Sequence, residues 1–221
     1  MTILSRNDQG GRSMVEMLGV LAIIGVLSVG GISGYSKAMA KFKLTKAQDQ
    51  ISMILMNVRT AFATSPNYEG LTNASAIAFG IVPGEMSKKA VGDITINSDG
   101  TATSGASLNN PFGGEAHVFS CEATSTGVSP VAHEASCSDG SARVSGASYN
   151  SYFGIAMNNL GREVCTSLAS SDWGSDGLVA MEITDSEGTT KNIYPSAELP
   201  LTMGKAMTDC SPGAMIVWTY Y

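Results

Sequence analysis

Residues 14–32 read MVEMLGVLAIIGVLSVGGI, a nearly uninterrupted apolar run whose only charged side chain is Glu16. The run contains no proline, and Val, Ile and Leu dominate it, with several glycines between them. Glycine is frequent in membrane helices that pack closely on one another. About 20 such residues cross the hydrocarbon core of a bilayer. The run therefore predicts a helix long and apolar enough to span a membrane.

Beyond this run the pattern changes from apolar on all sides to amphipathic. Apolar residues recur at spacings of three and four, and they are Leu44, Ala47, Ile51, Ile54, Leu55, Val58 and Phe62. Because no proline occurs between Ser13 and Thr64, we predict one continuous helix with an apolar stripe along its second half. This helix would be roughly 75 Å long. It is expected to end near Ser65-Pro66, where proline stops it.

The rest of the chain is predicted to contain short strands. Two of them are expected at Asp93–Asn97 and Ala116–Ser120. The runs Leu178–Thr184 and Thr189–Tyr194 flank an Asp-Ser-Glu-Gly turn and predict a hairpin. Alternation along Ala214–Tyr220 predicts a last strand.

A second helix is predicted between Tyr149 and Ala169. Its apolar side would consist of Tyr152, Ile155, Ala156, Leu160, Val164 and Leu168. Together these elements predict an α+β fold. The second half of the long helix would pack on an antiparallel sheet, because its apolar stripe would otherwise face water.

The composition argues against several classes of function. Only 14% of the residues are charged and the net charge is −6, whereas a nucleic-acid-binding protein needs a basic face. The sequence has no G-x-S-x-G, P-loop or H-E-x-x-H motif, and two histidines make a poor catalytic inventory. We therefore predict that the chain is not an enzyme, holds no cofactor and binds no specific nucleic acid.

The four cysteines all lie beyond the apolar run, at Cys121, Cys137, Cys165 and Cys210. Their even number, their wide spacing and the lack of a C-x-x-C pair favour two disulfides in an oxidising compartment. Spacing alone leaves all three pairings open. Two His-x3-Cys pairs, beginning at His117 and His133, offer an alternative as a tetrahedral zinc site. Disulfides are the favoured interpretation, and no metal is predicted.

The segment Gly11-Arg12-Ser13-Met14-Val15-Glu16, with the apolar run after it, resembles the start of type IV prepilins. In that family a glycine precedes the scissile bond, a glutamate lies five residues beyond it and a hydrophobic helix follows. The resemblance implies cleavage between Gly11 and Arg12 by a prepilin peptidase, and N-methylation of Arg12. It divides the chain into a leader at residues 1–11, a transmembrane and assembly helix at 12–34 and a globular pilin head at 35–221.

Two further features resemble the type IVb pilins. One is the turn sequence Asn110-Pro111-Phe112-Gly113-Gly114, and the other is a cysteine on a late helix together with one near the C-terminus. This likeness implies a disulfide between Cys165 and Cys210. The second disulfide would then join Cys121 to Cys137.

The resemblance also implies partners and a location. The chain would be the major structural subunit of a type IV pilus, held in the bacterial inner membrane as a precursor and then exported in an extracellular filament, or fimbrium. Its expected partners are further copies of itself, the prepilin peptidase, the inner-membrane assembly platform with its ATPase, and a host or cell-surface receptor. Adhesion, motility, conjugation and DNA uptake all use such fibres, and the sequence leaves that choice open.

Glu16 is the residue of the apolar run that most needs an explanation. A carboxylate inside an apolar span costs about 2.5–3.5 kcal/mol on insertion scales. The resemblance supplies a partner, the α-amino group of Arg12 on a neighbouring subunit, so that both charges would be neutralised inside a filament. The alternative is that Glu16 lies at the membrane interface, where the helix dipole favours an acid.

Four lysines follow the apolar run, at Lys37, Lys41, Lys43 and Lys46. Basic residues beside a membrane span usually stay cytoplasmic, which would place the rest of the chain in the cytosol. The cysteines favour the opposite side, because paired thiols have little use in a reducing compartment. The lysines would then form a solvated helix face or contact acidic groups of adjacent subunits.

Three other interpretations stay open at this level. A pseudopilin or minor pilin of a secretion or pilus system would share the N-terminal chemistry. A single-span, membrane-anchored extracytoplasmic binding protein would need neither cleavage before Arg12 nor an acid at Glu16. A secreted enzyme behind a signal peptide would begin after the apolar run.

Overall fold

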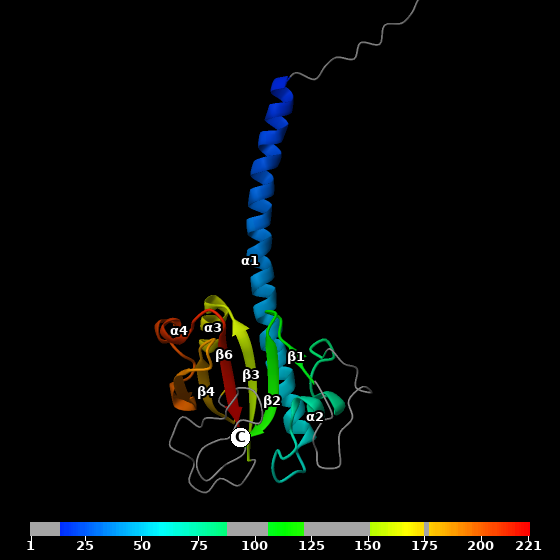
Figure 1. The fold of residues 1–221 in the computed structure, drawn as a ribbon, viewed down its shortest axis with the longest axis vertical. Coiled ribbons are helices and arrows are strands. Elements are labelled where there is room, and N and C mark those ends of the chain that lie inside the picture. The colour runs from blue at the N-terminus through cyan, green and yellow to red at the C-terminus, as the bar shows by residue number, and fades with distance from the viewer. Residues whose placement is uncertain (1–13, 88–105, 122–150, 175–176) are drawn as a thin grey trace, which may run out of the picture. The chain divides into compact units, whose positions relative to one another are not determined.

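The computed structural model describes residues 14–87, 106–121, 151–174 and 177–221 (Figure 1). The chain divides into two compact units, Met1–Phe42 and Lys43–Tyr221. In the first unit, every described residue belongs to a single helix. The predicted strand at Asp93–Asn97 lies outside the described residues.

Helix α1 runs from Met14 to Ala61 and confirms the single long helix expected from the sequence. It ends a few residues before Pro66, as predicted. Within the second unit, one side of α1 is buried, and its buried residues are Ala47, Gln50, Ile51, Ile54 and Val58. Gln50 is the polar member of this set, and its Nε2 donates to Glu85 Oε1 at 2.9 Å. The predicted stripe is therefore confirmed, with one amide inside it.

The second unit is built on a six-stranded antiparallel sheet with the order β1-β2-β3-β6-β4-β5. Its strands are β1 (Leu108–Asn109), β2 (Glu115–Cys121), β3 (Tyr152–Leu160), β4 (Leu178–Thr184), β5 (Thr190–Pro195) and β6 (Ala214–Tyr220). The last strand of the chain lies between β3 and β4, in the middle of the sheet (Figure 1). The α+β class, the strand near Ala116, the hairpin and the last strand are all confirmed.

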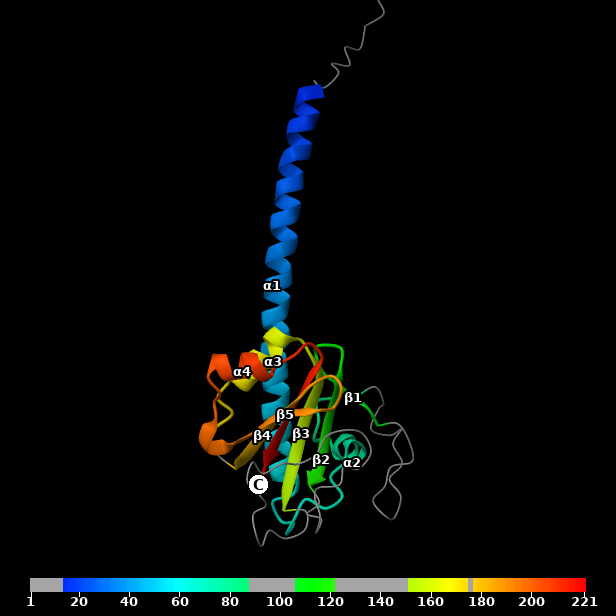
Figure 2. The ribbon, with the colours of Figure 1, turned by 60° about the vertical axis from the view of Figure 1, so that its left-hand side comes forward.

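The main core lies between one face of this sheet and the amphipathic part of α1 (Figure 2). Ile155, Trp218 and Met181 come from three neighbouring strands and are fully buried in it. Ile51 and Ile54 of α1 are fully buried in the same cluster. Burying one such side chain contributes about 1.5–3 kcal/mol, so the contact between α1 and the sheet stabilises the second unit substantially.

The helix predicted from Tyr149 to Ala169 is wrong over its first half. Tyr152–Leu160 form the strand β3, and only Arg162–Ala169 form a helix, α3. The strand pairs with β2 on one edge and β6 on the other, and both of its faces are covered. Ile155 is buried in the main core with α1, and Ala156 is buried in a second cluster with Val217. A continuous apolar run of this kind cannot be distinguished from a buried helix by its period. Gly154 leaves room in the strand for the Phe119 ring of β2, with which a Cβ at this position would collide.

The sequence patterns did not predict three short helical elements among the described residues. They are α2 (Asn73–Ala78), η2 (Ser196–Glu198) and α4 (Met203–Asp209). Helix α2 begins with a capping box, in which the Thr72 hydroxyl accepts from the Ser75 amide at 3.3 Å and the Ser75 hydroxyl accepts from the Thr72 amide at 2.8 Å. It lies beside β2, whereas α3 and α4 lie together (Figures 1 and 2).

The turn from Asn110 to Gly114 joins β1 to β2 and is organised by one buried side chain. The Asn110 Oδ1 accepts from the amides of Phe112 and Gly114 at 2.9 and 3.0 Å. Its Nδ2 donates to the carbonyls of Glu115 and Asn158 at 3.1 and 2.7 Å. Asn110 therefore fixes the turn and ties it to β3.

We expect Asn110→Ala to lower the free energy of unfolding by about 2–4 kcal/mol, because several hydrogen bonds are lost and buried partners stay unsatisfied. Chemical denaturation of the purified protein in detergent, followed by tryptophan fluorescence, measures this loss. Asn67→Ala is the control, since the Asn67 side chain accepts a single hydrogen bond in an exposed turn. Equal effects of the two substitutions would contradict the role given to Asn110.

Candidate assembly site

The first described part of α1 exposes a continuous apolar surface. Its large apolar side chains between Met14 and Ile32 are 49% to 82% exposed. Helix α1 contains a window long and apolar enough to cross a membrane, and none of that window is buried inside the chain. An exposed apolar surface of this size marks a contact with a membrane or with other protein.

Glu16 lies in the first turn of this helix. It has no ion-pair partner in the described part of the chain. The helix dipole favours an acid there by about 0.3–1 kcal/mol, whereas insertion into an apolar medium costs about 2.5–3.5 kcal/mol. A single copy therefore leaves most of this cost uncompensated. Gly11 and Arg12 lie outside the described residues, so cleavage and methylation there stay predictions.

Five glycines of the same helix make no close contact that would explain them within one described chain. They are Gly19, Gly25, Gly30, Gly31 and Gly34, and an added Cβ would meet nothing within 4 Å at any of them. Each costs a helix about 1 kcal/mol relative to alanine. Small residues allow neighbouring helices to approach closely, so these glycines suit close contacts between chains, and they also weaken the helix enough to let it loosen on extraction from a membrane.

A disulfide joins Cys165 to Cys210, as the resemblance implied. The two Cα atoms are 5.7 Å apart and the residues are 45 positions apart in the sequence. Cys165 lies in α3, and Cys210 caps the end of α4. The bridge thus holds these two helices together before the chain enters β6.

Cys121, at the end of β2, is also disulfide-bonded. Its predicted partner Cys137 lies outside the described residues, so this second pairing stays a prediction. A bridged cysteine supplies no thiolate to a metal ion, which removes Cys121 from the alternative zinc site. His133 also lies outside the described residues.

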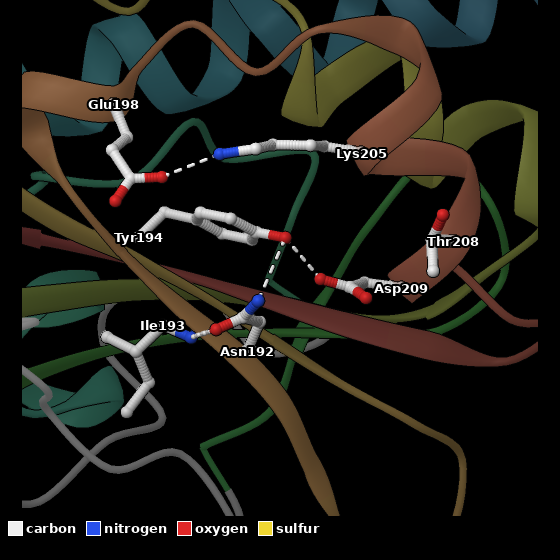
Figure 3. Close-up of a pocket in the computed structure, with 7 residues that line it drawn as sticks. All are labelled: Asn192, Ile193, Tyr194, Glu198, Lys205, Thr208 and Asp209. Carbon is white, nitrogen blue, oxygen red and sulfur yellow. Dashed lines mark hydrogen bonds and ion pairs between the residues drawn. The ribbon is translucent and has the colours of Figure 1, made fainter.

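A hollow of about 300 Å³ opens between β5 and α4 (Figure 3). It is lined by Asn192, Ile193, Tyr194, Glu198, Lys205, Thr208 and Asp209. Figure 3 shows the Tyr194 hydroxyl between the Asn192 amide, which donates to it at 3.2 Å, and the Asp209 carboxylate, to which it donates. Burial, and then the hydrogen bond to Asp209, raise the pKa of Tyr194 to about 12. Lys205 Nζ lies 2.8 Å from Glu198 Oε2.

The sequence patterns miss this hollow. Tyr194 and Asp209 are 15 positions apart, and α4, which places Asp209, is too short to show a helical period. The disulfide is the one sequence signal nearby, because Cys210 follows Asp209 directly. Of the sites singled out in the sequence, Glu16 belongs to the first unit and the Cys165–Cys210 bridge to the second.

A long helix with an exposed apolar half, followed by an antiparallel sheet and a disulfide-bridged C-terminal region, is the architecture of a type IV pilin. The family model for Bundlin matches residues 37–216, and the chain belongs to this family of type IVb pilins. Membership of a pilin family implies a structural subunit that self-assembles into an extracellular pilus.

Solved structures of pilins are similar to the chain. The type IVb pilin from Salmonella typhi has a TM-score of 0.50 and 16% sequence identity, over 80% of this chain and 98% of that one. TcpA, a type IV pilin from the Vibrio cholerae El Tor biotype, has a TM-score of 0.43 and 14% identity, over 81% of this chain and 99% of that one. The first of these likenesses supports the fold. No curated protein matches the chain.

Proposed function

We propose that the chain is a prepilin that is cut between Gly11 and Arg12, methylated on its new N-terminus and polymerised as the major structural subunit of a type IV pilus. The observation that carries this proposal is the exposed apolar half of α1, whose first turn holds Glu16 without an ion-pair partner among the described residues. Before assembly the bacterial inner membrane would cover this surface. In the filament the same half-helices of other copies would cover it.

Cleavage gives the chain the cation that Glu16 lacks. Peptide-bond hydrolysis before Arg12 frees an α-amino group, which is protonated at neutral pH. Its pairing with Glu16 of a neighbouring copy would neutralise two charges inside an apolar bundle, where either alone is costly. Because Arg12 and Glu16 are separated by a fixed number of residues in every copy, the pairing would also set the axial step between copies. The prepilin peptidase performs the cut, and the assembly platform and its ATPase supply the work of extraction.

The experiment that tests this proposal is the N-terminus and the intact mass, without reduction, of protein sheared from the cell surface. We expect a chain that begins with methylated Arg12 and is lighter by four hydrogens, for two disulfides. It should be the dominant protein of the sheared fraction if the chain is a major pilin. A chain that begins at Met1 and stays in the membrane would contradict polymerisation and support a single-span anchor. A chain that begins beyond Ser33 would indicate a signal peptide.

A further inference from the structure

Three lysines that follow the apolar run lack a partner. Lys37, Lys41 and Lys43 are exposed and have no ion-pair partner among the residues that the structure describes. Lys37 and Lys41 are one helical turn apart, where like charges destabilise a helix. Every other described lysine has a carboxylate partner at 2.7 to 3.1 Å: Lys46, Lys191 and Lys205. The three free lysines thus form a basic segment whose charges the described chain does not compensate.

The hollow between β5 and α4 has the opposite character. It is lined by two carboxylates and one ammonium group, and only one oxygen of each carboxylate is used: Glu198 Oε2 binds Lys205, and Asp209 Oδ2 binds Tyr194. Glu198 Oε1 and Asp209 Oδ1 have no hydrogen-bond partner among the described residues. The side chain of Asn192 adds a further oxygen, which already accepts from the Ile193 amide at 3.0 Å.

The hydroxyl donors of this hollow are already in use. The Tyr194 hydroxyl donates to Asp209, and the Thr208 hydroxyl donates to the Gly204 carbonyl at 3.0 Å. The Lys205 ammonium group is committed to Glu198 and lies 5.8 Å from the centroid of the Tyr194 ring. An acceptor-rich, net negative hollow suits a ligand that is cationic and rich in donors, and a lysine ammonium group carries three donors and no acceptor.

We propose that this hollow receives an ammonium group from the Lys37–Lys43 segment of a second copy of the chain. The inference rests on the proposed function, because a filament is what would bring two copies together at the required density. Lys37, Lys41 and Lys43 are the first charged side chains beyond the apolar half of α1. In a filament bundled through that half, they are therefore the first charges that the neighbouring heads must accommodate.

Two features of the head favour this occupant. The carboxylate of Asp209 adjoins Cys210, and the Cys165–Cys210 bridge anchors the end of α4, so the acceptors are held in place before a partner arrives. The Tyr194 hydroxyl donates to Asp209 Oδ2, so a hydrogen bond also orients this carboxylate. Charge complementarity of this kind selects partners and their register more than it adds affinity.

Zero-length carbodiimide cross-linking of intact sheared filaments tests the contact directly. We expect dimer bands whose peptides join Lys37, Lys41 or Lys43 to Asp209 or Glu198. The Lys46–Glu85 pair, at 3.1 Å within one chain, is the internal control for the reaction. Filaments in which Lys46 and Glu85 are linked, but the basic segment is joined to other carboxylates or to none, would overturn this contact and leave the proposed function standing. If the chain forms no filaments, the proposed function and the contact fail together.

A double-mutant cycle separates a direct contact from a general charge effect. We expect Glu198→Gln with Asp209→Asn to weaken the association of subunits by up to about fivefold, the scale of an exposed ion pair, measured as the protein left in filaments as the salt concentration is raised. Lys37→Gln with Lys41→Gln and Lys43→Gln should give a similar loss, and combining the two sets should add little. Glu163→Gln with Glu187→Gln, which removes two exposed acids outside the hollow, is the control with the same change in net charge and should have no effect.

The same variants show whether the three lysines contact the hollow or something else. Intact mass without reduction shows whether each variant keeps its disulfides, so misfolded variants are recognised. Additive losses in the cycle would overturn the contact. So would lysine variants that change only the membrane retention of the precursor, because that result would assign the basic segment to lipid phosphates.

Discussion

Glu16→Ala is expected to abolish surface filaments while leaving the head folded. In the proposed filament this substitution leaves the α-amino group of Arg12 unpaired inside an apolar bundle, and removing one partner of a buried ion pair costs about 3–5 kcal/mol. The loss recurs at every subunit, so filament protein in the sheared fraction should fall below detection. Immunoblots of sheared and membrane fractions, with the mass of the membrane form, measure the result.

Glu163→Ala is the matched control for this experiment. Glu163 is an exposed acid in the first turn of α3, so its removal changes the net charge and a helix N-terminus in the same way. It should leave filaments at the wild-type level. If Glu16→Ala also assembles normally, the acid is only an interfacial residue at the start of α1, and the pairing with Arg12 is wrong.

The second large effect is expected from loss of the disulfide in the double variant Cys165→Ala and Cys210→Ala. A cross-link that closes a loop of this length restricts the unfolded chain by about 4 kcal/mol on the loop-entropy model. Both residues are buried, so the packing of α3 against α4 loosens as well. We expect a lower denaturation midpoint and less precursor in the membrane, since an unstable exported head is degraded.

Reduction of the wild-type protein is the control for this prediction. Its denaturation midpoint should fall to near that of the double variant, or below it, because Cys121 is also disulfide-bonded. A double variant that loses less than about 1 kcal/mol would show that the contacts of α3 and α4 suffice without the bridge. In that case the bridge would not be what holds the hollow between β5 and α4 in place for the lysines of a second copy.

The elements that the sequence predicts well are those in which local pattern and tertiary environment agree. Helix α1 has no proline and a clear change from an all-apolar to a one-sided pattern, so its span and its buried face follow from spacing. The β4–β5 hairpin follows from two runs around Asp185, whose carboxylate accepts from the amides of Glu187 and Thr189 at 2.9 and 2.8 Å. The Cys165–Cys210 bridge follows from the family resemblance and not from spacing.

The sequence predictions fail where a segment is buried on both faces, or where the contacting residues are far apart in the sequence. Tyr152–Leu160 has an apolar run that suits a helix, yet it forms a strand between β2 and β6 whose two faces are buried in separate apolar clusters. The hollow between β5 and α4 depends on Tyr194 meeting Asp209, and no local pattern records that meeting. The turn at Asn110 was visible as a motif, but its hydrogen bond to Asn158 was not.

The sequence by itself determined the apolar half of α1, the acid within it and the amphipathic stripe that follows, because these depend on the order of side chains along one helix. The tertiary structure alone decided that Ala214–Tyr220 lies between β3 and β4, that Tyr152–Leu160 is a strand, and that an acceptor-rich hollow forms beside β5. These features depend on which distant segments share a surface. Helical order is local, whereas strand pairing and pocket formation are set by long-range contacts whose energy appears only when the chain has folded.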